Sequence, residues 1–206
     1  MNIKQWSAKD ILTTSLPLPE ASQLHIWLFS EEDTTTLDNV HKNLLALSTK
    51  EQAHFLLKHL LSLYLHIPEQ DIVFQKEKHG KPFFETFPAL YFNLSHTNGC
   101  IAIAFSSTSP VGIDVEKIRQ KNNFQAIARR TFLPEEAEHL KYLEGEEEQQ
   151  YFFRCWTRTE AFLKGIGTGL SASFTDEKIQ EEYTFWEIQN ITAPEGYVCS
   201  VAYRTL

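Results

Sequence analysis

Cysteine is scarce in this sequence of 206 residues, and the way the few cysteines are spaced excludes one class of protein. The three cysteines, Cys100, Cys155 and Cys199, lie far apart and form no CxxC pair. A disulfide framework needs an even number of cysteines that can be paired. We therefore expect three reduced thiols, and their apolar and aromatic neighbours predict small buried side chains rather than catalytic groups.

The sequence also lacks a long apolar run. The most apolar stretch, residues 55–67, is interrupted by Lys58, His59 and His66. It is too short and too polar to span a membrane. The first ten residues contain no apolar segment of the kind found in signal peptides. We therefore expect a cytoplasmic protein with no membrane partner.

An excess of positive charge is missing as well. Lysine and arginine number 19 against 27 aspartates and glutamates, which gives a formal net charge of −8. This negative net charge argues against a protein whose main function is to bind the backbone of a nucleic acid. Hydrophobic residues make up 42% and charged residues 22% of the chain, as in ordinary folded proteins. A local basic pocket for a small phosphorylated ligand remains compatible with these numbers.

The pattern of apolar residues predicts an α+β fold with mostly antiparallel strands. Strands are predicted over residues 24–29, 71–76, 91–96, 100–106, 111–118, 183–188 and 197–203. Helices are predicted over residues 36–47, 124–130, 134–143 and 147–164, and from a capping box at Ser48 and Glu51 up to Pro68. The polar segment 106–110 divides the chain into halves of similar order, residues 1–108 and 109–206.

Two carboxylates stand out in the predicted strand over residues 111–118. Asp114 and Glu116 are two residues apart, so both side chains lie on the same face of the strand. Neighbouring carboxylates repel each other unless a cation lies between them, and oxygen ligands suit Mg²⁺ or Mn²⁺. Alone, the same pattern is also that of an ordinary solvated strand face.

A second group of candidates follows on a predicted helix. Trp156, Glu160 and Lys164 are spaced four residues apart and form one stripe. A Glu–Lys pair at this spacing is usually an exposed pair of small energetic value. This helix, however, is apolar over much of its circumference, and buried charges need a partner or a metal.

Two further segments carry groups that suit a phosphorylated ligand. Asn93 and Ser95 share one face of a predicted strand, and His96 ends that strand beside an Asn-Gly hairpin turn. In the segment HGKP, Lys81 is held in a turn where it can contact a phosphate as a point charge. Taken singly, His96 is equally a structural hydrogen-bonding residue, and Lys81 an exposed turn lysine.

The order of these motifs is more specific than any one of them. The chain contains, in this order, the motifs GKP, FNLSH, VGIDVE and FxxxWTxxEAFLKGxGxGL. With this order it resembles the surfactin-type 4′-phosphopantetheinyl transferases from about residue 44 to about residue 175. The resemblance implies two similar α+β halves related by a pseudo-twofold axis, with the active site between them. It also implies that the phosphopantetheine arm of coenzyme A is moved to a serine of an acyl or peptidyl carrier protein. Adenosine 3′,5′-bisphosphate is the other product.

The resemblance also implies roles for single residues. Asp114, Glu116 and Glu160 would hold Mg²⁺, with Mn²⁺ as a substitute, against the coenzyme A pyrophosphate. Lys164 would contact the phosphates and assist the leaving group. Glu160 or a water on the metal would accept the proton of the carrier serine.

The coenzyme A nucleotide would be bound mainly by the first half. Lys81, Ser95 and His96 are the expected contacts in that half. Family members tend to carry an arginine near the start of the helix before GKP, where this chain offers Lys50 as a weak substitute. They also usually carry lysine where this chain has Thr159.

These departures keep two alternatives to an active transferase open. One is a catalytically weak relative that binds coenzyme A or a carrier protein as a scaffold. The other is a metal-dependent phosphohydrolase that acts on another pyrophosphate. Because two fused halves make one chain sufficient, a monomer is expected.

Overall fold

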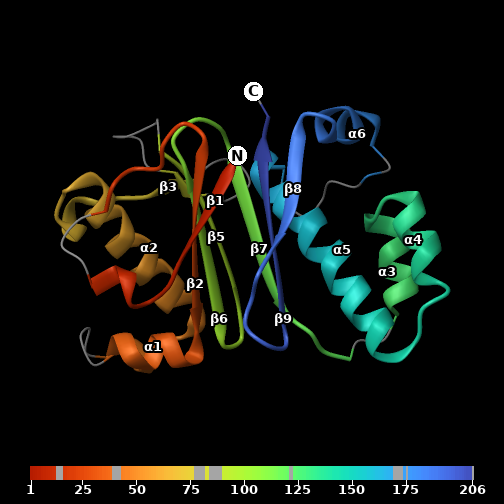
Figure 1. Ribbon diagram of the computed structural model, residues 1–206, viewed down its shortest axis with the longest axis horizontal. Helices are drawn as coiled ribbons and strands as arrows, with labels where there is room; N and C mark the ends of the chain where they lie inside the picture. Colours follow the sequence, from red (N-terminus) through yellow and green to blue (C-terminus); the bar gives the residue numbers. More distant parts are fainter. Residues whose placement is uncertain are drawn as a thin grey trace.

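The computed structural model describes residues 1–12, 16–38, 43–76, 82–83, 90–120, 123–168, 174 and 176–205. It has two main sheets in the middle of the molecule, with helices on their outer sides (Figure 1). None of the helices in these ranges is long and apolar enough to cross a membrane.

The first sheet is formed by strands from the first half of the chain. Its strand order is β1-β2-β6-β5, in which β1 pairs with β2 in parallel and the other neighbours are antiparallel. The strands are β1 (Asn2–Trp6), β2 (Gln23–Ser30), β5 (Tyr91–Thr97) and β6 (Cys100–Ser106). The helices of this half are α1 (Glu31–Asp38) and α2 (Thr49–Leu65), with 3-10 turns at Asp10–Leu12, Leu44–Ala46 and Glu69–Asp71. The two-residue strands β3 (Gln75–Lys76) and β4 (Pro82–Phe83) pair separately.

The second sheet is formed by strands from the second half. Its order is β7-β9-β8, and all neighbours are antiparallel. The strands are β7 (Val111–Lys117), β8 (Trp186–Ile191) and β9 (Tyr197–Arg204). The helices are α3 (Phe124–Thr131), α4 (Pro134–Leu140), α5 (Gly145–Ile166) and α6 (Glu177–Tyr183). The long helix α5 lies against β7 and β9, and α3 and α4 pack on its other side (Figure 1).

The same strand order occurs in both halves. In the first, β2 is followed by helix α2 and then by β5 and β6, and the last of these strands lies in the middle of β2-β6-β5. In the second, β7 is followed by α5 and then by β8 and β9, with the last strand again in the middle. This repetition confirms the predicted α+β fold of two similar halves.

The two sheets share an apolar core. Leu24, Ile26 and Leu28 of β2 point into it, and from the second sheet Val111, Ile113 and Val115 of β7 point to the same core. The alternate residues of β2 instead face α2, where Trp27 and Phe29 are fully buried. Both faces of β2 are therefore covered, as expected for a strand in the interior of a layered fold.

Several predicted elements are confirmed by the structure. Ser48 and Glu51 form the expected capping box, in which each side chain accepts a hydrogen bond from the other residue's backbone N–H. The hairpin β5–β6 turns at Gly99, whose φ of 80° is in the left-handed region that favours glycine. The cysteines are free and buried, as their apolar neighbours predict.

Other boundaries were predicted wrongly for local reasons. The helix expected over residues 36–47 begins earlier, because Ser30 and Asp33 cap its start with reciprocal hydrogen bonds of 2.9 and 3.2 Å. The strand expected from residue 71 is reduced to Gln75–Lys76, since a 3-10 turn follows Pro68. By contrast, helix α5 differs from its predicted range of 147–164 by only two residues at each end, and it is capped at Gly167 with a φ of 75°.

The second half contains one helix that the sequence pattern did not predict. Asp176 caps α6 by accepting a hydrogen bond of 2.9 Å from the Lys178 backbone N–H. The helix then runs to Tyr183, whose ring packs edge-on against Phe162 at 5.0 Å. Strand β8 therefore begins at Trp186 rather than at residue 183.

A buried histidine makes the stability of the first half dependent on pH. His25 is 1% exposed, and its Nδ1 lies 2.8 Å from the Tyr64 hydroxyl, which also accepts a hydrogen bond from the Trp27 indole at 3.0 Å. Burial, and then the positive charge of Lys4, lowers the pKa of His25 from 6.5 to about 4. The folded protein therefore holds a neutral imidazole at pH 7.

This pKa predicts how stability changes with acid. The unfolded chain binds a proton at His25 below pH 6.5 while the folded protein does not, so the stabilising contribution is complete above pH 6.5 and is lost as the pH falls toward about 4. The full loss is on the order of 3 kcal/mol. Urea unfolding at several pH values should show a steeper loss of stability in the native protein than in His25→Gln. Equal slopes for the two proteins would contradict the prediction.

Candidate active site

The candidate site lies where the edge strands β5 and β7 meet beneath helix α5. The close approach of the helix depends on Gly112, where a Cβ would lie 2.0 Å from the Ala161 carbonyl oxygen and 2.4 Å from the Gly165 nitrogen. Only a residue without a side chain fits at such a distance. The glycine of VGIDVE therefore allows α5, with Glu160 and Lys164, to lie directly on the strand that carries Asp114.

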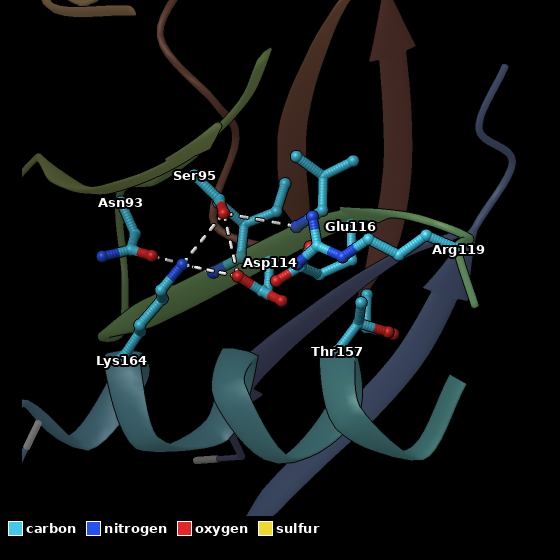
Figure 2. A network of polar contacts seen from close by, with 10 residues as sticks. Asn93, Ser95, Asp114, Glu116, Arg119, Thr157 and Lys164 are labelled. Atoms are coloured by element: carbon cyan, nitrogen blue, oxygen red, sulfur yellow. Dashed lines mark hydrogen bonds and ion pairs between the residues drawn. The ribbon is translucent and has the colours of Figure 1, made fainter. Parts of the chain in front are cut away.

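Asp114 is at the centre of a polar network (Figure 2). Although it lies on a strand, its side chain is buried and the residue is only 4% exposed. Its Oδ1 accepts hydrogen bonds from Lys164 Nζ at 2.6 Å and from the Ser95 hydroxyl at 2.8 Å. Its Oδ2 is buried and has no hydrogen-bond partner among the described residues. A solvated strand face is thus excluded for Asp114.

Glu160 is a second buried carboxylate near Asp114, and it is 6% exposed. Burial, and then the negative charge of Asp114, raises the pKa of Glu160 from 4.5 to about 7, while the positive charge of Lys164 opposes this increase. Glu116 also contributes to the increase, while its own carboxylate lies 3.7 Å from the Arg119 guanidinium. The electrostatic coupling shows that the three carboxylates share one region of the protein.

These residues fit a divalent cation. The buried Asp114 Oδ2 is left without a partner, and Glu160 is held in a field of two further negative charges. An oxygen-ligated cation would satisfy both conditions. Among the described residues, however, no three His, Cys, Asp or Glu side chains are already arranged as a metal site. Lys164 instead supplies the positive charge that contacts Asp114.

Ser95 connects β5 of the first sheet to β7 and α5. Its hydroxyl donates to Asp114 Oδ1 and accepts a hydrogen bond from Lys164 Nζ at 2.9 Å. The Val115 backbone N–H also donates to this hydroxyl, at 3.3 Å. Three separate elements, β5, β7 and α5, are therefore joined at one oxygen atom.

Basic side chains lie on the other face of β5. His96 follows Ser95 on the strand and so points to the opposite side. Partial desolvation of its ring lowers the pKa of His96, and the charges of Lys164, His54 and Lys50 lower it further. His54 and Lys50 lie on the first turns of α2, where His54 Nδ1 is 2.8 Å from the Lys50 carbonyl oxygen. Lys50, His54 and His96 form a basic cluster, whose ammonium and imidazole groups can donate hydrogen bonds to an anionic ligand.

His54 is a candidate that the sequence pattern missed. The spacing of four residues between Lys50 and His54 is a visible sign that both lie on one side of the helix. His96, at the end of β5, lies 42 residues farther along the chain than His54. No local sequence pattern therefore connects the two histidines. Lys81, the other predicted phosphate contact, lies outside the described residues.

The structure thus brings most of the predicted site residues into one neighbourhood. Ser95, Asp114 and Lys164 are in direct contact. The negative charges of Asp114 and Glu116 raise the pKa of Glu160. The positive charge of Lys50 lowers the pKa of His96. Thr159, where the resemblance leads us to expect a lysine, is 4% exposed and therefore lies in the interior rather than at the surface.

A comparison with known proteins shows what this chain is similar to. The family model of the 4′-phosphopantetheinyl transferase superfamily matches residues 110–202. Over these residues the chain carries the domain of this family. The matched range contains the three candidate carboxylates and Lys164, whereas Lys50, His54 and His96 lie before it.

Curated relatives extend the similarity into the first half. The chain is 38% identical over 121 residues to the 4′-phosphopantetheinyl transferase HetI of Nostoc sp., covering 56% of this chain and 50% of the relative. It is 37% identical over 155 residues to the 4′-phosphopantetheinyl transferase psf-1 of Bacillus pumilus, covering 72% and 65% respectively. It is 34% identical over 128 residues to the 4′-phosphopantetheinyl transferase Sfp of Bacillus subtilis, covering 59% and 56%. The chain thus spans between half and two thirds of the length of these relatives.

Proposed function

We propose that this chain transfers the 4′-phosphopantetheine arm of coenzyme A to a serine of an acyl or peptidyl carrier protein. The observation that carries the proposal is the buried network of Ser95, Asp114 and Lys164, in which one carboxylate oxygen lacks a partner beside Glu160. Such a site can hold a cation and a phosphate at the same time. Adenosine 3′,5′-bisphosphate is the proposed second product.

The proposed cation ligands are Asp114, Glu116 and Glu160, for Mg²⁺ or, as a substitute, Mn²⁺. When bound, such an ion would neutralise the pyrophosphate and the charge that develops on the leaving phosphate. Oxygen ligands alone favour these ions over zinc. The coupling of the three carboxylates supports the assignment.

The chain's own side chains have distinct roles in the proposed transfer. The serine oxygen of the carrier forms a bond to the phosphorus of the pantetheine phosphate, and the bond from that phosphorus to the bridging oxygen breaks. Lys164 lies 2.6 Å from Asp114 and carries the positive charge needed by the departing phosphate. Glu160 is the proposed acceptor of the serine proton.

The nucleotide of coenzyme A is proposed to lie against the first half. Lys50, His54 and His96 form the basic cluster that would bind its phosphates, with Ser95 as a further contact on the neighbouring face of β5. Lys81 is proposed as a further contact from the predicted turn. The arginine that relatives tend to carry near the start of this helix is thereby replaced by a lysine and a histidine one turn apart.

The proposal includes a division of labour between two parts of the chain. Residues 1–108 would provide the nucleotide contacts, and residues 109–206 the metal ligands and the catalytic helix. The active site would lie at their junction. We propose that the protein works as a cytoplasmic monomer.

A carrier-protein assay tests the proposed function. The purified protein is mixed with Mg²⁺, coenzyme A and each of several apo carrier proteins, and the carriers are weighed by mass spectrometry. A gain equal to one phosphopantetheine group on at least one carrier is expected. Binding of coenzyme A by calorimetry without this gain would indicate a scaffold, and release of product without a carrier would indicate a hydrolase.

The basic cluster predicts a specific defect in coenzyme A binding. His54→Ala removes one phosphate contact but leaves the reacting phosphorus and its neighbours untouched. The KM for coenzyme A should therefore rise by roughly tenfold, the scale of one hydrogen bond to a charged group, with little change in kcat. Lys178→Ala, which removes an exposed cation on α6, is the control. An unchanged KM in His54→Ala would remove His54 from the proposed site.

A further inference from the structure

The two sheets of the protein are joined by side chains where their edges meet. Strand β5 is the edge of the first sheet, and β7 is the edge of the second. An edge strand leaves backbone N–H groups without a partner in its own sheet, and buried N–H groups need one. In β7 these groups belong to Ile113 and Val115, the residues on either side of Asp114.

Both N–H groups are satisfied by polar side chains of β5. The Ile113 N–H donates to Asn93 Oδ1 at 2.9 Å, and the Val115 N–H donates to the Ser95 hydroxyl at 3.3 Å. Asn93 and Ser95 are each 5% exposed, so water does not compete for these bonds. Figure 2 shows Asn93 and Ser95 side by side above the strand that carries Asp114. Two residues of FNLSH thus fix the backbone on both sides of one carboxylate.

We propose that Asn93 is a positioning residue for Asp114, because its carboxamide fixes β7 to the first half and so holds the Asp114 carboxylate at the cation site. The inference rests on the proposed function for the identity of the bound cation. Ser95 touches Asp114 and Lys164 directly and therefore belongs to the site itself. Asn93 acts on Asp114 through the Ile113 backbone, which makes it the cleaner test of positioning.

The expected effect of Asn93 follows from how ligands are held. A cation site needs its carboxylates within a few tenths of an ångström of the productive geometry. Removal of a residue that orients a metal ligand typically weakens metal binding between about 10-fold and 100-fold. A residue that only stabilises the fold would lower the melting temperature and leave the affinity of the folded protein unchanged.

A matched pair of variants separates these possibilities. Asn93→Leu keeps the size of the side chain and removes the oxygen that accepts from Ile113. Asn93→Asp keeps an accepting oxygen at the same place. The probe is Mn²⁺ alone, and its free concentration is followed by electron paramagnetic resonance while the protein is titrated. Ser106→Ala is the control for stability, since Ser106 Oγ accepts from two backbone N–H groups of the turn before β7 and contacts none of the proposed ligands.

The expected result is specific to the Asn93 oxygen. Asn93→Leu should bind Mn²⁺ roughly tenfold or more weakly than the native protein. Asn93→Asp and Ser106→Ala should bind it as tightly as the native protein does, even where Ser106→Ala melts at a lower temperature. Raising the Mn²⁺ concentration should restore much of the transferase activity of Asn93→Leu.

Other outcomes overturn the inference. If Asn93→Leu binds Mn²⁺ like the native protein, Asn93 does not position Asp114, although the proposed function stands. If the native protein itself binds no Mn²⁺, the proposed metal site fails and this inference fails with it. If Asn93→Leu does not fold, hydrogen exchange at the Ile113 amide of the native protein decides, because fast exchange there would mean that Asn93 does not hold β7.

Discussion

Replacement of Asp114 by alanine is expected to lower kcat/KM for the carrier at least about 100-fold, the scale for loss of a charge-stabilising group at a transfer site. The variant removes the carboxylate that contacts Lys164 and Ser95 and that has one oxygen free for a cation. Lys164 would then lose its fixed partner and its orientation toward the phosphates. Glu160→Ala should have an effect of similar size, because it removes a second buried carboxylate from the same region.

The fold should survive both substitutions, and circular dichroism and the melting temperature check this. Glu138→Ala is the matched control, since it removes a carboxylate from the same half whose side chain is 55% exposed. It should keep nearly native activity. Near-native turnover by Asp114→Ala or by Glu160→Ala would remove these residues from the proposed metal site.

The second large effect is expected at Gly112, which has no chemical group to contribute. In Gly112→Ala the new methyl carbon would lie 2.0 Å from a backbone oxygen of α5, so either the strand or the helix must move. Overpacking of a core typically costs about 1–3 kcal/mol, and backbone atoms can relax less than side chains. Because α5 carries Glu160 and Lys164, the displacement should also reduce activity more than tenfold, as expected for a misplaced catalytic group.

A second glycine provides the control for this prediction. At Gly196 an added methyl group would meet nothing within 4 Å, although its φ of 80° makes any side chain somewhat strained. Gly196→Ala should therefore lose about 1 kcal/mol of stability and keep its activity. The melting temperature and kcat/KM of the two variants are compared in the same assay. If Gly112→Ala is as active and as stable as Gly196→Ala, α5 does not depend on close contact with β7.

Much of the fold could be predicted from local sequence. The capping box at Ser48 and Glu51, the Asn98–Gly99 turn and the alternation along β7 each contain their structural cause within a few residues. These elements were predicted at nearly their observed positions. The order of the four motifs gave the family resemblance from which the site residues were predicted, and their roles stay a prediction.

The parts that could not be predicted depend on contacts between distant segments. Strand β1 contains Lys4 and Gln5, shows no apolar alternation and forms only by pairing in parallel with β2. His54 comes near enough to His96 to lower its pKa only because α2 packs on the first sheet. The sequence placed Asn93 only on the same strand face as Ser95, and its bond to the Ile113 backbone depends on β5 lying beside β7.

The two halves share a strand order but carry different ionisable side chains. Two topologically equivalent units meet, but one presents Lys50, His54 and His96 while the other presents its carboxylates. A symmetric pair of identical units would offer a ligand two equivalent orientations. In the proposed site the basic groups and the carboxylates lie at different ends, so we expect a ligand with a cation at one end and bare phosphates at the other to bind in a single direction.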